Sequence, residues 1–287
     1  MERIVVGIDF SKGALHAFRY ALQMAKKTRA DIRLVWVDNL SSGEAVFNSP
    51  ANEIRADAKE NVESLIEKYK DHPGIGNLDF RLMKGKVGTE LARHAREFKA
   101  DFIVVGTHGI TGFEEYWIGS NANRVVIYAS CPVITVRYDY EIPEKVSTIV
   151  LPIDSTRETI QKLPHVKHLA EVCNSKVIIL GIYTTSLQSM NKKVDKLVHD
   201  TEEYMKKYGV VYVKDCIKTD NLARDVIDYA REYLADMIAI MSERESSTSN
   251  MLLGEYAHKI VNHSPVPVLN IRSTENFKLE LKKYTAG

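Results

Sequence analysis

The stretch RIVVGIDFSKGALHAFRYALQMAKKTRADIRLVWV, residues 3–37, decides the fold. It begins with a short apolar run rich in β-branched residues, which is typical of a buried strand. Apolar residues at helical spacing follow over 13–28, and a second apolar run covers 31–37. This strand–helix–strand order predicts two parallel strands joined by a helix that covers one face of the sheet.

The same pattern returns later in the chain. Residues 148–182 align with 3–37 without a gap at a shift of 145, and residues 235–272 align with 100–137 at a shift of 135. The shift falls by ten between the two blocks, so the second copy has lost ten residues after its second strand. Loops absorb such deletions more easily than core elements do. The chain is therefore a tandem repeat.

Each copy predicts an α/β unit: a doubly wound, five-stranded, mainly parallel sheet with helices on both faces. In the first copy, the further elements expected are helices over 53–70, 89–98 and 120–129 and strands over 78–85, 101–106 and 131–137. Thr89 is the expected N-cap of its helix. Two such units account for the 287 residues, with domains expected at 1–139 and 140–287 and the junction in YDYEIPEK, residues 138–145.

The composition points away from several classes of protein. Formal net charge is +1 with acids and bases interspersed, so we expect no nucleic-acid partner. Cys131, Cys173 and Cys216 are far apart and outside any CxxC spacing, which argues against a zinc site or a disulfide framework. No apolar run approaches eighteen residues and the N-terminus lacks a signal-peptide pattern, so we expect no membrane partner and a cytoplasmic location.

Three segments of the first copy end at one edge of the expected sheet: GIDFS (7–11), VWVDN (35–39) and VVGTHG (104–109). Glycine permits positive φ and close approach of a backbone to a ligand, and free N–H groups at a helix start form an anion site. Glycine-rich loops are also often plain turns. No GxGxxG follows the first strand and GxxxxGK[ST] is absent, which argues against a Rossmann dehydrogenase and a P-loop NTPase.

The glycines nevertheless have a specific spacing. Gly106 is followed after two residues by Gly109 and, after nine more, by Gly119 and Ser120. Together with VVGIDFS at residues 5–11 and KGKVGTELARHA at 84–95, this pattern resembles the nucleotide-binding members of the universal stress protein family. The resemblance covers nearly the whole chain and implies two tandem units of the adenine nucleotide alpha hydrolase-like fold.

The resemblance implies ATP as the ligand of the first copy. Asp9 could hold Mg²⁺ through the phosphates, because that ion needs few protein ligands. It assigns Asp9 to the ribose, the backbone of Val37 to the adenine, and the glycine-rich loop to the phosphates. The family often has a basic residue where His108 stands, which puts the role of His108 in doubt. The expected site is Gly7, Ile8, Asp9, Ser11, Val37, Gly106, Thr107, His108, Gly109, Gly119, Ser120, Asn121 and Ala122.

The second copy departs from this pattern. Met241, Arg244, Gly254 and Glu255 stand where the first copy has its three spaced glycines and the serine. We expect the larger side chains to fill the cleft and the carboxylate to repel phosphate, so the second site is expected not to bind nucleotide. Asp154 is retained, either as a structural acid at the strand end or as a mark of a different small ligand.

No HExxH, GxSxG or other catalytic motif is present. Three functions stay open: a nucleotide-responsive stress or regulatory module, a slow ATPase, and an interaction scaffold with a structural nucleotide. The resemblance further implies that CPVITVR (131–137) and PVPVLNIR (265–272) pair antiparallel, so that one chain imitates a dimer. Association into a homodimer and the identity of a protein partner stay open. Residues 40–56 are a candidate lid over the adenine.

Overall fold

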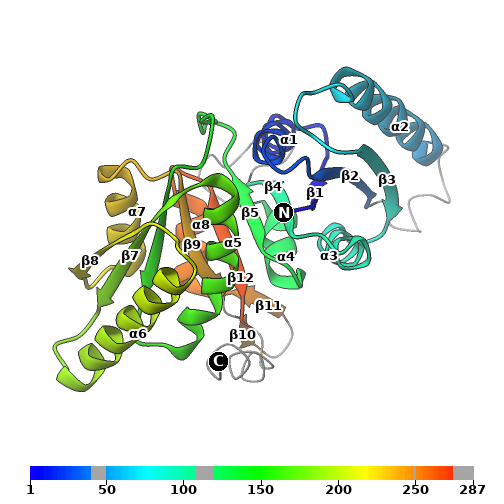
Figure 1. The fold of residues 1–287 in the computed structure, drawn as a ribbon. Helices are drawn as coiled ribbons and strands as arrows, with labels where there is room; N and C mark the ends of the chain where they lie inside the picture. The colour runs from blue at the N-terminus through cyan, green and yellow to red at the C-terminus, as the bar shows by residue number, and fades with distance from the viewer. Residues whose placement is uncertain (40–49, 108–118, 243, 248–249, 274–287) are drawn as a thin grey trace.

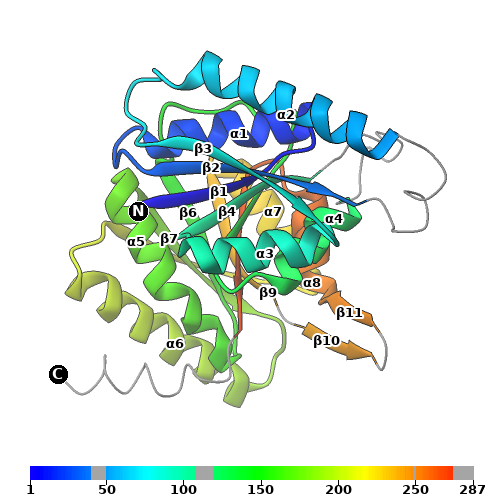
Figure 2. The ribbon, with the colours of Figure 1, turned by 90° about the vertical axis from the view of Figure 1, so that its right-hand side faces the viewer.

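The computed structural model describes residues 1–39, 50–107, 119–242, 244–247 and 250–273. The chain forms one large sheet with helices on both faces, and the two repeats lie side by side along that sheet (Figures 1 and 2). The strand order is β3-β2-β1-β4-β5-β12-β9-β6-β7-β8. Each repeat thus contributes five strands in the same relative order, which confirms the predicted fold class.

The elements of the first repeat follow the predicted order. They are β1 (Arg3–Gly7), α1 (Lys12–Ala25), β2 (Asp31–Asp38), α2 (Pro50–Tyr69), β3 (Leu78–Lys84), α3 (Val87–Phe98), β4 (Phe102–Gly106), α4 (Ser120–Tyr128) and β5 (Val133–Val136). Thr89 is not a cap, so that prediction is wrong: Gly85 turns the chain at a φ of +136°, and α3 begins two residues before Thr89, after Lys86.

The second repeat has the same framework with two additions. Its elements are β6 (Thr148–Ile153), the 3₁₀ helix η2 (Arg157–Lys162), α5 (Leu163–Cys173), β7 (Lys176–Tyr183), α6 (Gln188–Lys207), β8 (Tyr212–Lys218), α7 (Leu222–Glu232), β9 (Met237–Ser242), β10 (Arg244–Ser247), β11 (Asn250–Leu253), α8 (Glu255–His263) and β12 (Val268–Arg272). The sequence did not predict η2 or the β10–β11 hairpin. The connection from β7 to α6 is shorter than that from β2 to α2, where the ten-residue deletion was inferred.

The two repeats join through their last strands. β5 and β12 pair antiparallel, while the strands within each repeat pair parallel. Ile134 lies opposite Leu269, which is its own equivalent in the other repeat, so a pseudo-two-fold axis passes between them. Thr135 and its equivalent Asn270 meet at this seam, where Asn270 Nδ2 donates to Thr135 Oγ1 at 3.3 Å. The predicted antiparallel pairing of the last strands is confirmed.

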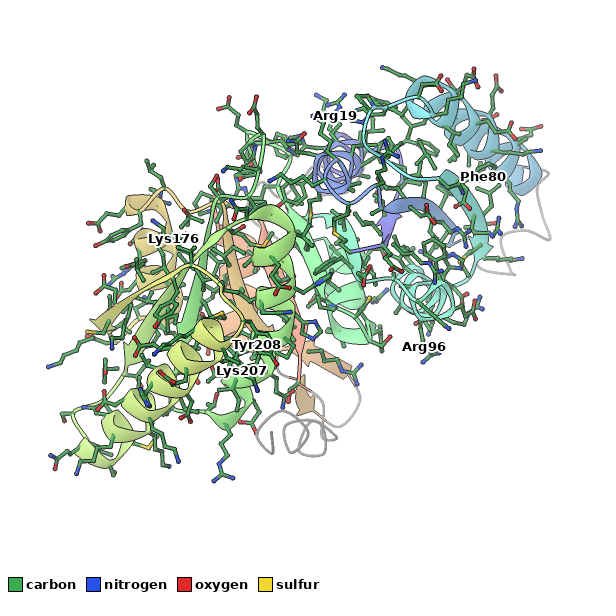
Figure 3. The ribbon with its side chains drawn as sticks, in the orientation of Figure 1. Arg19, Phe80, Arg96, Lys176, Lys207 and Tyr208 are labelled. Carbon is green, nitrogen blue, oxygen red and sulfur yellow. The ribbon has the colours of Figure 1, made fainter. Side chains whose placement is uncertain are left out.

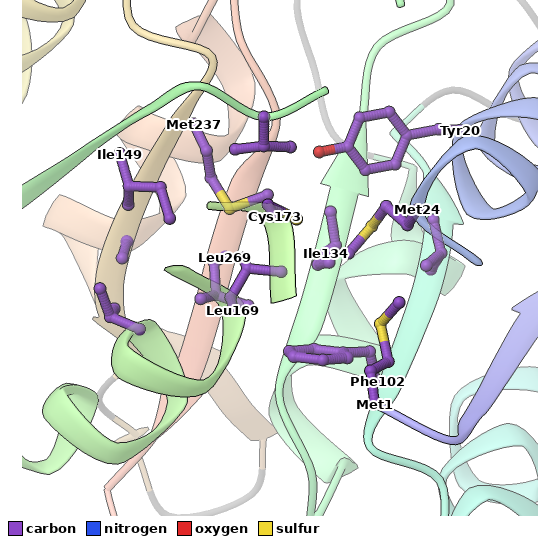
Figure 4. Close-up of a cluster of buried hydrophobic side chains, with 14 of the residues drawn as sticks. Met1, Tyr20, Met24, Phe102, Ile134, Ile149, Leu169, Cys173, Met237 and Leu269 are labelled. Atoms are coloured by element: carbon purple, nitrogen blue, oxygen red, sulfur yellow. The ribbon is translucent and has the colours of Figure 1, made fainter. Parts of the chain in front are cut away.

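Two hydrophobic clusters cover the two faces of the sheet, and each draws residues from both repeats. One contains the inner sides of α1 and α5, and the other those of α3, α4, α7 and α8. Figure 4 shows the centre of the first cluster, where Met1, Tyr20, Met24, Phe102 and Ile134 of the first repeat approach Leu169, Cys173, Met237 and Leu269 of the second. Burial of each large side chain contributes about 1.5–3 kcal/mol, so the shared cluster ties the repeats together.

In each repeat, an aspartate carboxylate anchors the first strand by hydrogen bonds to its backbone. Asp101 Oδ2 accepts hydrogen bonds from the backbone N–H groups of residues 2–3, at 2.6 and 3.0 Å. Asp236 Oδ2 accepts from those of residues 147–148, at 2.7 and 2.8 Å. Because these bonds involve a charged acceptor, they are stronger than ordinary backbone bonds and fix where β1 and β6 enter the sheet.

Charged side chains are spread over the outside of the molecule. Arg19, Arg96, Lys176 and Lys207 are exposed and lie on separate parts of the surface (Figure 3). Within the described residues, no helix combines the length and the apolar composition that crossing a bilayer requires.

Candidate functional site

The candidate cleft of the first repeat lies where the strand order reverses. β1 pairs with β2 on one side and with β4 on the other. α1 packs on β1 and β4 from one face, whereas α3 packs on β1 and β2 from the other face. Ligands of open parallel sheets bind beyond the carboxyl ends of such strands. The segments after Gly7 and Gly106 leave neighbouring strands at this edge, as predicted.

Asp9 shapes the loop that leaves β1. Its Oδ1 accepts a hydrogen bond from the backbone N–H of Ser11 at 3.0 Å, and Ser11 Oγ in turn accepts from the N–H of Ala14 at 3.1 Å, which caps α1. Phe10, between them, has a φ of +63°, a conformation that bulky residues rarely adopt. Such strained positions concentrate at ligand sites. Asp9 Oδ2 has no hydrogen bond within the described residues.

Val37 offers backbone groups to the same crevice. The N–H of Ile8 donates to the carbonyl of Val35 at 3.0 Å, just beyond the last β1–β2 register pair. Backbone groups alternate sides along a strand, so the N–H and C=O of Val37 point to the side that faces β1. Among the described residues, no strand pairs with Val37 on that side. Its side chain packs on the cluster formed by α3 and α4.

Gly106, at the end of β4, is required by packing. A Cβ atom at this position would lie 2.6 Å from the backbone C and O atoms of Gly13 and 3.0 Å from the N of Ala14. The first turn of α1 therefore approaches β4 as closely as it does because residue 106 has no side chain. The sequence pattern predicted that residue 106 is glycine because of a ligand, and the close packing against Gly13 is a second reason for a glycine here.

The start of α4 is held next to the end of β4. Thr107 is buried, and its N–H donates to the carbonyl of Val136 at 3.0 Å. The N–H of Gly119 donates to the carbonyl of Thr107 at 2.5 Å. Thr107 and Gly119 thus lie next to each other. His108 and Gly109, which belong to the predicted site, lie outside the described residues.

The N-terminus of α4 faces this point, and no side chain among the described residues is seen to cap it. Gly119 is the N-cap residue and makes no side-chain hydrogen bond. Its φ is −54°, so Gly119 does not use the freedom of glycine to adopt a positive φ. Ser120 and Asn121 are exposed and Ala122 is buried. Uncapped N–H groups together with the positive end of the helix dipole favour an anion here.

The equivalent cleft of the second repeat is altered but not filled. A cavity of about 250 Å³ remains, lined by Met241, Gly254 and Glu255 among others. The prediction that larger side chains would fill it is therefore wrong in part. Met241 stands where the first repeat has Gly106, and η2, which packs beside β9, replaces the first turn of the helix.

Two side chains of this second cleft were missed by sequence reasoning. Lys162 and Tyr256 both line the cavity. Lys162 aligns with Ala17 of the first copy, so a lysine on the apolar face of a helix was the signal that could have revealed it. Tyr256 aligns with Asn121, and nothing in its neighbourhood in the sequence distinguishes it.

The described part of the chain has no preformed metal site: no three or more His, Cys, Asp or Glu side chains are close enough to share an ion. Mg²⁺ bound through phosphates needs only one or two protein ligands, so the carboxylate of Asp9 fits that mode.

Comparison with known proteins agrees with the repeat structure. The model of the universal stress protein family matches residues 1–137 and again residues 145–272. A universal stress protein of Methanocaldococcus jannaschii is 28% identical over 141 residues, covering 47% of this chain and 82% of that protein. A putative universal stress protein of Staphylococcus epidermidis is 31% identical over 149 residues, covering 50% of this chain and 87% of that protein.

A solved structure shares the whole architecture. The crystal structure of a universal stress protein from Archaeoglobus fulgidus DSM 4304 has a TM-score of 0.75 to this chain at 17% identity, and the match covers 96% of this chain and 97% of that one. At this identity the likeness concerns the fold, including the presence of two repeats in one chain.

Proposed function

The chain belongs to the universal stress protein family, and from this premise we propose that its first repeat binds ATP and acts as a nucleotide-responsive stress or regulatory module. The observation that carries the proposal is the meeting of two features at one point of the β1/β4 crevice. The uncapped start of α4 is tied to the end of β4 by the bond from Gly119 to Thr107, and the free carboxylate oxygen of Asp9 lies after the neighbouring strand.

The phosphates would occupy the start of α4. The backbone N–H groups of Ser120, Asn121 and Ala122 and the hydroxyl of Ser120 are suitable donors, and the dipole of α4 stabilises negative charge at that end. His108 and Gly109 would complete the phosphate loop by their place in the glycine spacing. A bound Mg²⁺ would neutralise part of the phosphate charge in place of the basic residue that the loop lacks at position 108.

The nucleoside would lie across β1 and β2. Asp9 Oδ2 is suited to accept hydrogen bonds from ribose hydroxyls, and the unpaired N–H and C=O of Val37 are suited to the edge of an adenine ring. Gly7 and Ile8 form the floor of this part of the crevice, and Ser11 keeps the loop in place by capping α1. A nucleotide alters the contacts of such a module with a partner only if it binds two states of the protein with different affinity.

The test is a calorimetric titration of the full chain with ATP, ADP and AMP, with Gly119→Val as the diagnostic variant. Valine tolerates the φ of −54° and ψ of 142° at this position, so the fold should persist while the side chain obstructs the helix start. We expect one ATP per chain and an affinity loss of about 100-fold in Gly119→Val.

The second repeat supplies the matched control. Gly254 is the N-cap of α8 with nearly the same backbone, φ −55° and ψ 148°. Gly254→Val should leave ATP binding unchanged. Two ATP molecules per chain, or equal affinity in wild type and Gly119→Val, would contradict the proposal. Phosphate release that disappears in Asp9→Ala would favour a slow ATPase, and a tightly retained nucleotide without turnover would favour the scaffold.

A further inference from the structure

The second repeat has a cavity of about 250 Å³ at the position that corresponds to the cleft of the first. It lies beyond the carboxyl ends of β6, β7 and β9 and beside the start of α8. The residues that differ between this cavity and the first cleft give the cavity a buried cation, a buried hydroxyl and a more apolar wall. It therefore differs in chemistry from a phosphate site.

Lys162 places an ammonium group in this cavity. The residue is only 3% exposed, and its Nζ donates one hydrogen bond, to the carbonyl of Pro152. An ammonium has three N–H donors, so two have no partner within the described residues. Burial lowers the pKa of Lys162 to about 8, against the opposing influence of the Asp154 carboxylate, so the charged form still predominates at neutral pH. A buried cation with unused donors requires an acceptor.

Two more polar groups of the cavity have unused hydrogen-bonding capacity. The hydroxyl of Tyr256, on the first turn of α8, is buried and has no partner in the described structure. Asp154 Oδ1 accepts from the N–H and the hydroxyl of Thr156, at 2.9 and 2.6 Å, whereas no described residue donates to its Oδ2. The cavity thus presents donors at Lys162 and Tyr256 and an acceptor at Asp154.

The rest of the lining limits the ligand further. Ile182, Leu222 and Met241 form an apolar wall. Glu255, which is exposed and paired with Lys259 at 2.5 Å, adds negative charge to the lining and disfavours phosphates. One positive and one negative inner charge with an apolar wall suit a ligand that carries both charges and a hydrocarbon group.

We propose that this cavity binds a free α-amino acid with an apolar side chain. Its carboxylate would be held by Lys162 and Tyr256, its ammonium group by Asp154, and its side chain by the wall of Ile182, Leu222 and Met241. Transfer of the zwitterion from water is offset because each of its charges meets an opposite charge in the cavity. The proposal is independent of nucleotide binding in the first repeat.

The experiment is a calorimetric titration of the full chain at pH 7 with alanine, valine, leucine, isoleucine and methionine. We expect at least one of them to bind with a Kd of about 1 mM or tighter. The amide of the best ligand, which lacks the carboxylate, and its deaminated acid, which lacks the ammonium group, should each bind at least about tenfold more weakly.

Two variants test the assigned residues. Lys162→Met keeps the length of the side chain without its charge, and Asp154→Asn keeps the bonds to Thr156; each should lose affinity at least about tenfold. Asp9→Asn, at the equivalent position of the first repeat, should bind the amino acid as the wild type does. Thermal melts of each variant, followed by circular dichroism, report whether the chain is folded. Failure of all five amino acids to bind, or unchanged binding in both cavity variants, would overturn the proposal.

Discussion

The two repeats have the same scaffold and different clefts. The anchoring carboxylates Asp101 and Asp236 make the same pair of backbone bonds, and Arg29 and its equivalent Asn174 both adopt a left-handed conformation, with φ of 52° and 54°. The clefts differ because small residues of the first repeat are replaced by larger ones. The shared fold therefore depends on features outside the cleft, so the residues that line the cleft can differ between the repeats.

The clearest contrast is at the end of the fourth strand of each repeat. Gly106 lets α1 begin at Lys12, in contact with the strand. In the second repeat Met241 stands at the same place, and the first helix begins differently. There η2 occupies Arg157–Lys162, and α5 begins only at Leu163. A side chain on the strand therefore accompanies a rearranged first turn of the helix, and that turn carries Lys162 into the cavity.

The largest expected effect comes from copying this exchange into the first repeat. Gly106→Met should lower the free energy of unfolding by about 3 kcal/mol, because its Cβ would lie 2.6 Å from the backbone of Gly13. Denaturant titration measures this loss, and ATP binding should fall with it. Gly181→Ala is a control at a roomier glycine, where the nearest atom to a Cβ is a flexible Val198 methyl at 3.2 Å. Equal stability of Gly106→Met and wild type would mean that the helix start adapts freely.

The next effect concerns the buried lysine. Lys162→Met should raise the free energy of unfolding by about 3 kcal/mol at pH 7, because the folded chain holds Lys162 at a pKa of about 8 and the unfolded chain at 10.5. Between pH values of about 8 and 10.5 the unfolded chain keeps the proton on Lys162 that the folded chain has lost. The unfolding free energy of the wild type therefore rises with pH, and the stability advantage of Lys162→Met shrinks.

Denaturant titrations between pH 7 and 10 measure this difference. Lys176→Met is the control, since Lys176 is exposed at the start of β7 (Figure 3) and its loss should change little. A pH-independent difference between Lys162→Met and wild type would show that Lys162 does not titrate in this interval.

Loss of either anchoring carboxylate is expected to destabilise the chain, the second repeat more than the first. Asp236→Ala should cost about 2 kcal/mol of unfolding free energy, because two backbone N–H groups lose a charged acceptor. Asp101→Ala should cost less, since one of its two bonds is exposed. The measurement is a pair of thermal melts, with Asp101→Asn and Asp236→Asn as variants that keep an acceptor oxygen. No loss in either alanine variant would remove these residues from the shared scaffold.

The smallest effect concerns Asp9 and Asp154, the acids that occupy equivalent strand ends in the two repeats. Asp9→Asn should weaken ATP binding about tenfold, because an amide is a poorer acceptor for ribose hydroxyls than a carboxylate. Asp154→Asn should leave ATP affinity unchanged. Parallel calorimetric titrations give both values, and an equal loss in the two variants would indicate that the second repeat takes part in nucleotide binding.

The fold could be predicted from the sequence because both copies show the same periodicity. The helix starts were harder. Thr89 has the residue type of a cap, but Gly85 decides where α3 begins. The η2 turn lies against β9, the strand that carries Met241, which is some eighty residues away in the sequence and meets η2 only in the folded sheet.

The candidate site was predictable in part. Asp9 and Gly119 were singled out by type and spacing, and the structure places Asp9 after β1 and Gly119 beside the end of the neighbouring β4. Their role in a nucleotide site stays a prediction. The packing role of Gly106 was not predictable, since it depends on how closely Gly13 approaches. The cavity of the second repeat was missed because a lysine among apolar residues is normally taken to be exposed, whereas Lys162 is buried by the altered helix start.

The antiparallel pairing of β5 with β12 has one more consequence. If two separate, identical subunits met through such strands, every substitution would appear on both sides of the axis, and the two clefts would have to remain alike. Covalent fusion removes that constraint. Met241 and Lys162 can occur once per molecule, so the two clefts of a single polypeptide can differ in chemistry while their strands belong to one sheet.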